Sequence, residues 1–205
     1  MITEKPRDSL TQAHMVLARI PERYWAARYE DFPEGYDGVE AIGAYLDDLL
    51  VNVTDGVGVL LWGKAGHGKT HMAISILKKL LAHNATGLYL DAPGIQGHVI
   101  EKTALDVVQR PLIEVAKDVD MLVLDDFGAE HASSFSKVLV EQLIRSRGTR
   151  NKTTVITTNI PTKNIGAVYG NGLASVLLEY VCPVQINGKD WREDKQAEMR
   201  KRFVR

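Results

Sequence analysis

GKAGHGKT, residues 63–70, is the stretch that decides the fold this sequence predicts. It fits the pattern G-x-x-x-x-G-K-[ST] without a mismatch, and it follows the apolar run GVGVLLW directly and opens a stretch of helical periodicity. In such a strand–loop–helix unit, glycines let consecutive backbone N–H groups point at phosphate oxygens, and the helix N-terminus adds a partial positive charge. The sequence therefore predicts a phosphate-binding loop.

This loop supplies candidate residues for ATP or ADP and for Mg²⁺. Lys69 would reach the β- and γ-phosphates, and the Thr70 hydroxyl would bind the metal ion. A separate metal site at the two loop histidines is disfavoured because no third ligand has suitable spacing, so both are expected to face solvent or to lie near phosphate. The residues expected to contact the nucleotide are Gly63, Lys64, Ala65, Gly66, His67, Gly68, Lys69, Thr70 and His71.

A second apolar run, MLVLDDFGAE at residues 121–130, ends in the adjacent carboxylates of Asp125 and Asp126. In P-loop enzymes a carboxylate at the end of a neighbouring strand holds the Mg²⁺ that bridges the β- and γ-phosphates. Asp125 is predicted to take that place, and Asp126 to orient or deprotonate the attacking water. An ordinary strand-end turn would explain the DFG tripeptide but not its coincidence with the loop. A kinase motif is excluded because no H-R-D sequence precedes it.

A third apolar run, TTVITTN at residues 153–159, also ends in a polar residue, Asn159. Ligands of open α/β sheets bind at the carboxyl ends of the strands, where this amide could hold the lytic water or touch the γ-phosphate. An Asx turn before Pro161 is the alternative explanation. The position at the strand end favours the functional interpretation.

Apolar runs and helical stretches alternate along the chain. The first helix is expected at residues 9–20, with Asp8 or Ser9 as its cap, and residues 21–38, with five aromatics, are expected to cover an apolar surface. Near-continuous apolar strands alternating with helices indicate a mostly parallel sheet covered on both faces. Strands are predicted at 56–62, 87–92, 120–126, 153–159 and 182–187, and further helices at 39–51, 69–82, 96–117 with a break at Pro111, 134–147 and 173–180.

Composition limits the functional classes. The chain has 205 residues, enough for one good core, and 25 Lys plus Arg against 26 Asp plus Glu exclude a uniformly basic nucleic-acid binder. With one cysteine, Cys182, no internal disulfide can form, which favours a reducing cytoplasm. There is no apolar signal core at the N-terminus and no apolar run near the roughly 20 residues that a membrane span needs. The expectation is a soluble, cytoplasmic, single-domain protein without membrane contact.

Together, GKAGHGKT, LVLDDFG and TTN resemble the AAA+ ATPases. More narrowly, with IPERYWAARYEDF at residues 20–32 and GKDWR at 188–192, the chain is similar to bacterial replicative-helicase loaders of the DnaC type and to the related transposition helper ATPases of the IstB type. The resemblance implies an α/β P-loop NTPase of AAA+ type with little or no C-terminal helical lid. It implies that Asn159 is the first sensor and Arg192 the second. The domains implied are residues 1–19 as a tail and short helix available to a partner, 20–192 as the ATPase domain, and 193–205 as a charged tail.

The sequence departs from the family pattern in one helix. Family members carry an arginine before the last strand that reaches a neighbouring subunit's ATP site, and the matching residue here is Val176. An arginine supplied in trans is worth several orders of magnitude in rate, so its absence predicts slow turnover by the isolated protein. Arg145, Arg147 and Arg150 are candidate substitutes. The favoured alternative is that these three form a solvated basic helix end that suits the helix dipole.

The function that the resemblance implies is ATP-dependent helicase loading in DNA replication. The partners implied are a hexameric DnaB-type helicase, single-stranded DNA, and like subunits in self-association or a mixed AAA+ assembly. Two alternatives stay open: a transposition helper of the IstB type, and a nucleotide-gated binding protein with little hydrolysis. The basic residues at 200–205 could touch single-stranded DNA, but an exposed mixed-charge helix end explains them equally well. Loaders usually carry a helicase-binding domain before the ATPase, so that contact is expected to be reduced to the first helix or missing.

Overall fold

A parallel β-sheet forms the centre of the molecule in the computed structural model, which describes residues 2–3, 6, 9–99, 111–129 and 134–203. In that part of the chain five strands pair in the order β2-β3-β4-β1-β5, and every pairing is parallel. The predicted mostly parallel sheet is confirmed. The strands are β1 (Gly58–Trp62), β2 (Gly87–Asp91), β3 (Met121–Phe127), β4 (Thr153–Thr158) and β5 (Val181–Gln185).

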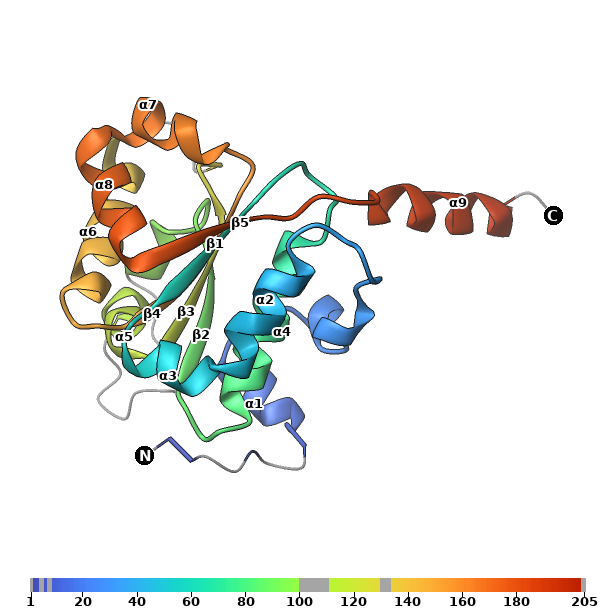
Figure 1. Cartoon of the computed structure of the whole chain (residues 1–205), viewed down its shortest axis with the longest axis horizontal. Helices are drawn as coiled ribbons and strands as arrows, with labels where there is room; N and C mark the ends of the chain where they lie inside the picture. The colour runs from blue at the N-terminus through green and yellow to red at the C-terminus, as the bar shows by residue number, and fades with distance from the viewer. Residues whose placement is uncertain (1, 4–5, 7–8, 100–110, 130–133, 204–205) are drawn as a thin grey trace.

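Helices cover both faces of this sheet (Figure 1). Side chains alternate between the faces, so that Val59 and Leu61 of β1 enter one core and Leu60 the other. One face is covered by α1 (Gln12–Leu17), α2 (Val39–Asp47), α3 (Leu49–Thr54) and α4 (Lys69–Leu81). The other is covered by α5 (Leu112–Asp118), α6 (Ser134–Gly148), α7 (Ile165–Tyr169) and α8 (Asn171–Tyr180).

The segment between α1 and α2 lies over the first core. It contains the short helices η1 (Glu22–Tyr24) and η2 (Tyr29–Asp31), and the side chains of Phe32 and Tyr36 are buried in the first core. At the start of the segment, Ala18 O accepts from the N–H of Tyr89 on the edge strand β2, 2.8 Å away. The prediction that this aromatic stretch covers an apolar surface is confirmed.

Several element boundaries differ from the predicted ones. The first helix starts at Gln12 with Thr11 as its N-cap, so the predicted cap at Ser9 is wrong, and Asp8 lies outside the described residues. The predicted helix at 39–51 breaks at Asp48, where the Asn52 amide donates to Tyr45 O (3.0 Å). Helix α7 was not predicted. Of the helical stretch predicted at 96–117, η3 (Gly97–Val99) and α5 are observed, and residues 100–110 lie outside the described part.

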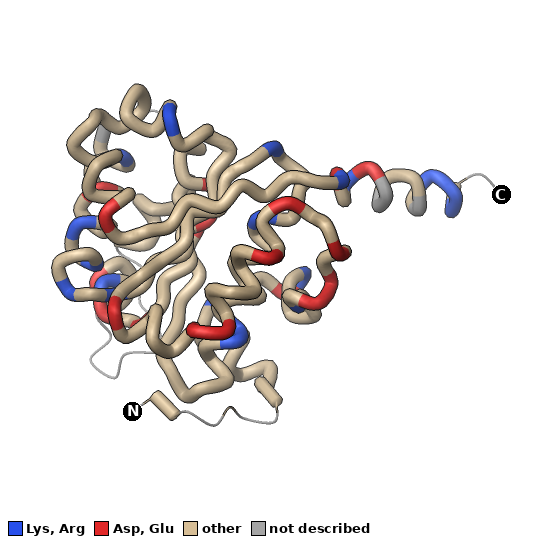
Figure 2. Tube along the Cα trace, in the orientation of Figure 1, with Lys and Arg blue, Asp and Glu red and all other residues tan. Residues whose placement is uncertain are grey.

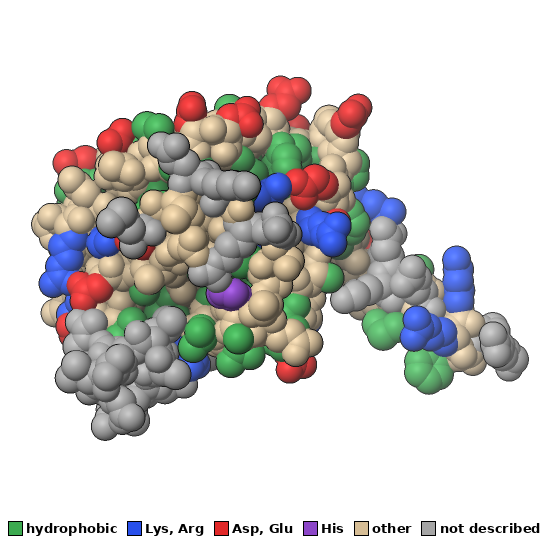
Figure 3. All heavy atoms as spheres, turned by 90° about the horizontal axis from the view of Figure 1, so that it is seen from below, with side chains coloured by type: hydrophobic (Ala, Val, Ile, Leu, Met, Phe, Trp, Pro, Cys, Tyr) green, Lys and Arg blue, Asp and Glu red, His purple; other side chains and the backbone are tan. Residues whose placement is uncertain are grey.

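The last described element is the helix α9 (Trp191–Phe203), which stands clear of the body (Figures 1 and 3). Its side chains are exposed wherever the structure describes them, including Phe203 at 86%. Basic residues gather at its far end (Figure 2). No long helical lid follows β5 in the described residues, as predicted. Among the described helices, none combines the length and the apolar character needed to cross a membrane.

Candidate functional site

The loop between β1 and α4 lies at the carboxyl edge of the sheet. Gly68, with φ +86°, takes the left-handed conformation at the N-cap of α4, which glycine adopts without steric cost. Gly63 packs so closely on the chain after β5 that a Cβ there would overlap Ile186 O. The loop is therefore curled tightly, with its backbone held against the last strand, as a phosphate-binding loop requires.

Lys69 turns back over this loop. Its side chain is 6% exposed, and its Nζ donates to Gly63 O (3.0 Å), Lys64 O (2.7 Å) and Asn159 Oδ1 (2.8 Å). Burial lowers the pKa of Lys69, while the nearby carboxylates of Asp126 and Asp125 raise it. Phosphate oxygens could replace the three oxygens that Lys69 now contacts, so this ammonium suits a phosphate ligand.

Asn159 lies directly after β4 and reaches Lys69 through its side-chain oxygen. The turn that follows is stabilised by Thr158, whose Oγ1 accepts from the N–H of Ile160 (3.0 Å) and donates to Phe127 O (2.6 Å). The strand-end turn therefore uses Thr158, and the Asn159 amide is directed at the loop lysine.

Asp125 is held in a buried hydrogen-bond network at the end of β3, and it is 3% exposed. Its Oδ1 accepts from Thr70 Oγ1 (2.9 Å) and Thr157 Oγ1 (2.6 Å), and its Oδ2 from Tyr89 OH (2.8 Å). Burial and the charge of Asp125 raise the pKa of Tyr89, which keeps the phenol protonated as a donor. These contacts fix the carboxylate beside the loop threonine.

Asp126 faces away from that network because the chain is irregular here. The register between β3 and β4 shifts between Leu124 and Phe127, and Asp126 has a φ of +54°, which is rare for a residue other than glycine. Its N–H donates to Thr157 Oγ1 (2.9 Å), while its side chain is exposed. The bulge therefore separates the two carboxylates, one buried and one at the surface of the site. Backbone strain of this kind clusters at functional sites.

Negative and positive neighbouring charges both act on the pKa of Asp126. Although the Asp126 side chain reaches the surface, its partial removal from water and the neighbouring Asp125 raise its pKa above the ordinary value of 3.8. The positive charges of Lys69, Arg192 and Arg23 oppose that shift. Arg192 is an exposed residue of the first turn of α9, and its charge also lowers the pKa of Lys69. The predicted second sensor is therefore within electrostatic range of the loop lysine and the exposed carboxylate.

Three residues near the site were not predicted. Thr157 and Tyr89 bind Asp125, and Arg23 in η1 acts on Asp126 through its charge. Tyr89 pairs in register with Val123, two residues before Asp125, so the two side chains share one face of the sheet. The strand register brings Thr157 and Tyr89 to Asp125, and a single apolar run does not reveal that register.

The two loop histidines differ in their surroundings. His67 is 8% exposed, so of the two expected positions it does not face solvent, and a position near phosphate stays a prediction. Its backbone O accepts from Tyr36 OH (2.9 Å). His71 Nε2 contacts Asp31 Oδ2 at 2.8 Å, and its ring packs edge-on against Phe32. His71 thus joins α4 to the aromatic segment. Within the described residues no three His, Cys, Asp or Glu side chains gather as a metal-binding group.

The basic residues at the end of α6 do not form a uniformly solvated group. Arg147 is fully buried and donates to the carbonyls of Ala116, Val119 and Thr153 and to Thr154 Oγ1. The favoured alternative of a solvated helix end is therefore wrong for Arg147, and a side chain bound in this way cannot reach another subunit.

Arg145 and Arg150 are at the surface instead. Arg145 pairs with Glu141 at 2.8 Å, and Arg150 pairs with Asp118 at 2.7 Å. Val176 is partly buried on α8, whose sequence contains no arginine.

The oxygen and nitrogen groups gathered at this site fit a nucleotide with Mg²⁺. Thr70 Oγ1 and Asp125 Oδ1 are 2.9 Å apart, and hydroxyl and carboxylate oxygens are ligands that Mg²⁺ accepts. Lys69 and the N-terminus of α4 add a positive charge and unpaired helix-end N–H groups beside these oxygens. A phosphate chain beside a magnesium ion is therefore the ligand that this arrangement suits.

Known proteins share both sequence and fold with this chain. The replicative helicase loader DnaC of Buchnera aphidicola (subsp. Acyrthosiphon pisum) is 22% identical over 157 residues, which are 74% of this chain and 63% of that protein. The replicative helicase loader DnaC of Escherichia coli (strain K12) is 28% identical over 98 residues, 47% of this chain and 40% of that protein. The chain therefore spans less than two thirds of the length of these relatives.

Solved structures share the fold of this chain. A crystal structure of the DnaC helicase loader superposes with a TM-score of 0.68 at 23% identity, covering 82% of this chain and 100% of that one. The DnaI structure gives 0.69 at 19% identity, covering 82% and 95%. The fold is thus that of P-loop AAA+ proteins. The family model described as "IstB-like ATP binding protein" matches residues 45–199, most of the sequence, and the chain belongs to that family.

Proposed function

We propose that this protein binds ATP with Mg²⁺, hydrolyses it slowly, and acts as a helicase loader. In this role the nucleotide state would control the placement of a hexameric DnaB-type helicase on single-stranded DNA. The observation that carries the proposal is that Lys69 at the start of α4, Asp125 in β3 and Asn159 just after β4 meet at one edge of the sheet. Membership of a family described by ATP binding and relatives named as helicase loaders support it.

Each side chain has a proposed role in the conversion of ATP and water to ADP and phosphate. Lys69 neutralises the β- and γ-phosphates, and Thr70 and Asp125 hold Mg²⁺, which when bound stabilises the negative charge on the phosphate oxygens. Asn159 contacts the γ-phosphate and the attacking water. Asp126 orients that water and accepts its proton, a role that its exposed position allows.

Arg192 is the proposed second sensor of the γ-phosphate. The ATPase domain is proposed to span residues 20–192, with residues 1–19 available to a partner and 193–205 as a charged tail. Helix α9 crosses the boundary at residue 193, so Arg192 and the charged tail move as one element. A rotation of α9 would therefore carry the sensor with it.

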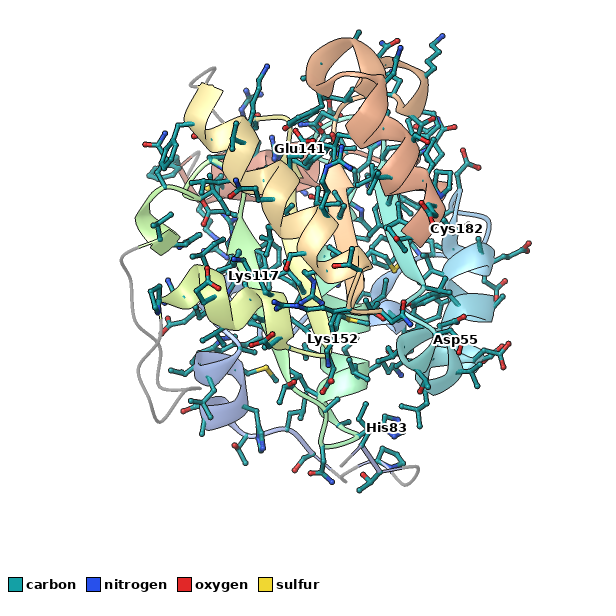
Figure 4. All side chains as sticks on the ribbon, turned by 90° about the vertical axis from the view of Figure 1, so that its left-hand side faces the viewer. Asp55, His83, Lys117, Glu141, Lys152 and Cys182 are labelled. Atoms are coloured by element: carbon teal, nitrogen blue, oxygen red, sulfur yellow. The ribbon has the colours of Figure 1, made fainter. Side chains whose placement is uncertain are left out.

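Replacement of Lys69 tests the nucleotide site. Lys69→Ala is expected to weaken ATP binding about tenfold to a hundredfold, because charge-assisted hydrogen bonds to phosphate contribute roughly 1.5–3 kcal/mol. Titration with a fluorescent ATP analogue measures this. Lys152→Ala is the matched control, since Lys152 pairs with Asp120 (2.9 Å) at the opposite, amino-terminal edge of the sheet (Figure 4). Unchanged ATP affinity in the Lys69 variant would refute the site.

A second candidate function is that of a transposition helper, which the IstB-like family description favours. Affinity capture from a lysate of the source cells separates the two, with and without ATP. Recovery of a replicative helicase supports loading, and recovery of a transposase supports the second function. ATP turnover, alone and with the partner and single-stranded DNA, then tests the proposed slow hydrolysis. Brisk turnover by the isolated protein would exclude a nucleotide-gated binding protein with little hydrolysis.

A further inference from the structure

Tyr36 lies where three separate segments meet: the aromatic segment, the phosphate-binding loop and the root of α9. Its side chain is 8% exposed. Its hydroxyl is 2.9 Å from His67 O in the loop and 3.0 Å from Lys189 O, just before α9. The same oxygen accepts from Trp191 Nε1, which is 3.3 Å away. A single phenol thus contacts both the loop and the start of the last helix.

The ring of Tyr36 is confined as closely as its hydroxyl. It packs edge-on against Phe32, with 5.5 Å between centroids, and at 6.5 Å from the ring of Trp191. The backbone of Gly188 lies against it so closely that a Cβ at that position would overlap the ring. The chain that leads into α9 is therefore shaped around Tyr36.

The contacts of Tyr36 with the start of α9 affect where Arg192 lies. The N–H of Trp191 donates to Gly66 O in the loop (3.1 Å), and the N–H of Arg192 donates to Asp190 Oδ1 (2.8 Å). The described side chains of α9 are all exposed, and beyond Trp191 no ring contact ties them to the body. The root contacts at residues 188–191 are then what holds Arg192 beside the site.

We propose that Tyr36 is a positioning residue that couples the phosphate-binding loop to Arg192. The inference rests on the proposed ATP-binding function and adds a residue to it. The phenol has one proton and two carbonyl acceptors, His67 O and Lys189 O, so it cannot donate fully to both. A shift of the loop on nucleotide binding therefore changes the hydrogen bond at the root of α9. Through that root the state of the loop reaches Arg192, which contacts a γ-phosphate that ATP has and ADP lacks.

Removing the hydroxyl alone tests the coupling. Tyr36→Phe keeps the ring and is expected to weaken ATP binding about threefold to tenfold, the range that one net hydrogen bond covers, with ADP binding changed less than about twofold. Arg192→Ala, like Tyr36→Phe, is expected to weaken ATP binding more than ADP binding. In the double variant the two effects should not add, because Tyr36 acts through Arg192. Calorimetric titration of the unaltered protein and the three variants, each with ATP and with ADP, measures these affinities.

Tyr45→Phe is the matched control, since Tyr45 is also buried and its hydroxyl donates one bond of 2.9 Å to a backbone carbonyl, Val57 O, away from the loop. Gly188→Ala is a second variant, which displaces the ring without removing the hydroxyl and should lower the ATP preference as Tyr36→Phe does. Equal losses of ATP and ADP affinity in Tyr36→Phe, or full additivity with Arg192→Ala, would overturn the inference while leaving the ATP site intact. Absence of ATP binding by the unaltered protein would instead overturn the proposed function itself.

Discussion

The guanidinium of Arg147 lies in the core between α5, α6 and β4, where its donors bind three backbone carbonyls and one threonine hydroxyl. Among the described residues no carboxylate contacts it directly, and Asp120 and Asp118 act on it through their charges. Burial lowers the pKa of Arg147. A buried charge of this kind is tolerated because its hydrogen bonds are satisfied, so removal of the side chain leaves several buried acceptors unpaired.

Arg147→Ala is therefore expected to lower the free energy of unfolding by about 3–5 kcal/mol, because buried acceptors lose their donor at roughly 1–3 kcal/mol each and the side chain leaves a cavity. Urea denaturation measures this change. Arg150→Ala, which removes an exposed ion pair with Asp118, is the control and should cost less than about 1 kcal/mol. If Arg147→Ala lowered the free energy of unfolding by less than about 1 kcal/mol, the buried hydrogen-bond network would contribute little to stability.

The ionised carboxylate of Asp126 is expected to lower the folding stability of the protein while it supports ATP hydrolysis. Because its pKa in the folded protein is raised above 3.8, the folded state keeps the proton to higher pH than the unfolded chain. The ionised carboxylate therefore costs folding free energy at neutral pH, and this cost disappears as the pH falls below the unfolded value.

Asp126→Asn should accordingly raise the unfolding temperature of the nucleotide-free protein at neutral pH, with the gain shrinking as the pH approaches 3.8. ATP turnover should fall about a hundredfold or more, because the amide cannot accept the proton of the attacking water. Thermal denaturation across a pH series and a phosphate-release assay check both effects. Stabilisation that is the same at every pH would contradict the assigned origin.

At the scale of elements, local patterns predict the strands and the loop but not the features that depend on pairing. The strand β3 and its two terminal carboxylates follow from one apolar run, whereas the bulge that separates Asp125 from Asp126 depends on the register with β4. For the same reason Asn159 was predicted from its place at a strand end, while Thr157 and Tyr89 were not. Cross-strand neighbours become visible only when the strand order is known.

Helices show the same limit in another form. Residues 193–205 were predicted as a charged tail, with an exposed mixed-charge helix end as one explanation of its basic residues. The bounds of α9 were not predicted, because its exposed residues leave no apolar face to produce a periodic pattern. The buried Arg147 was not predicted because basic residues in the last turn of a helix look alike in sequence whether they are solvated or buried. Helix α2 and helix α3 were merged because the break at Asp48 depends on a side chain that contacts the backbone.

At the scale of the whole molecule, three positive charges of this chain act on the exposed carboxylate. Lys69, Arg192 and Arg23 influence Asp126. The resemblance to AAA+ ATPases implies that Val176 of α8 takes the place of an arginine directed at a neighbouring subunit. Catalysis by an arginine in trans needs both that side chain and a subunit interface. A protein that has the subunit interface but lacks the arginine would bind ATP and associate with like subunits, and it would hydrolyse ATP slowly.

Val176→Arg tests whether like subunits associate in this way. If they do, the variant should hydrolyse ATP about tenfold faster or more, and its turnover per molecule should rise with protein concentration, because the added guanidinium acts on the phosphates of a second molecule. Turnover of the unaltered protein should stay slow throughout the same series. Val176→Gln, similar in length but uncharged, is the control for changes in packing on α8. Acceleration that does not depend on concentration would instead mean that the new arginine acts within its own chain, and a folded variant without acceleration would argue against an ATP site shared between like subunits.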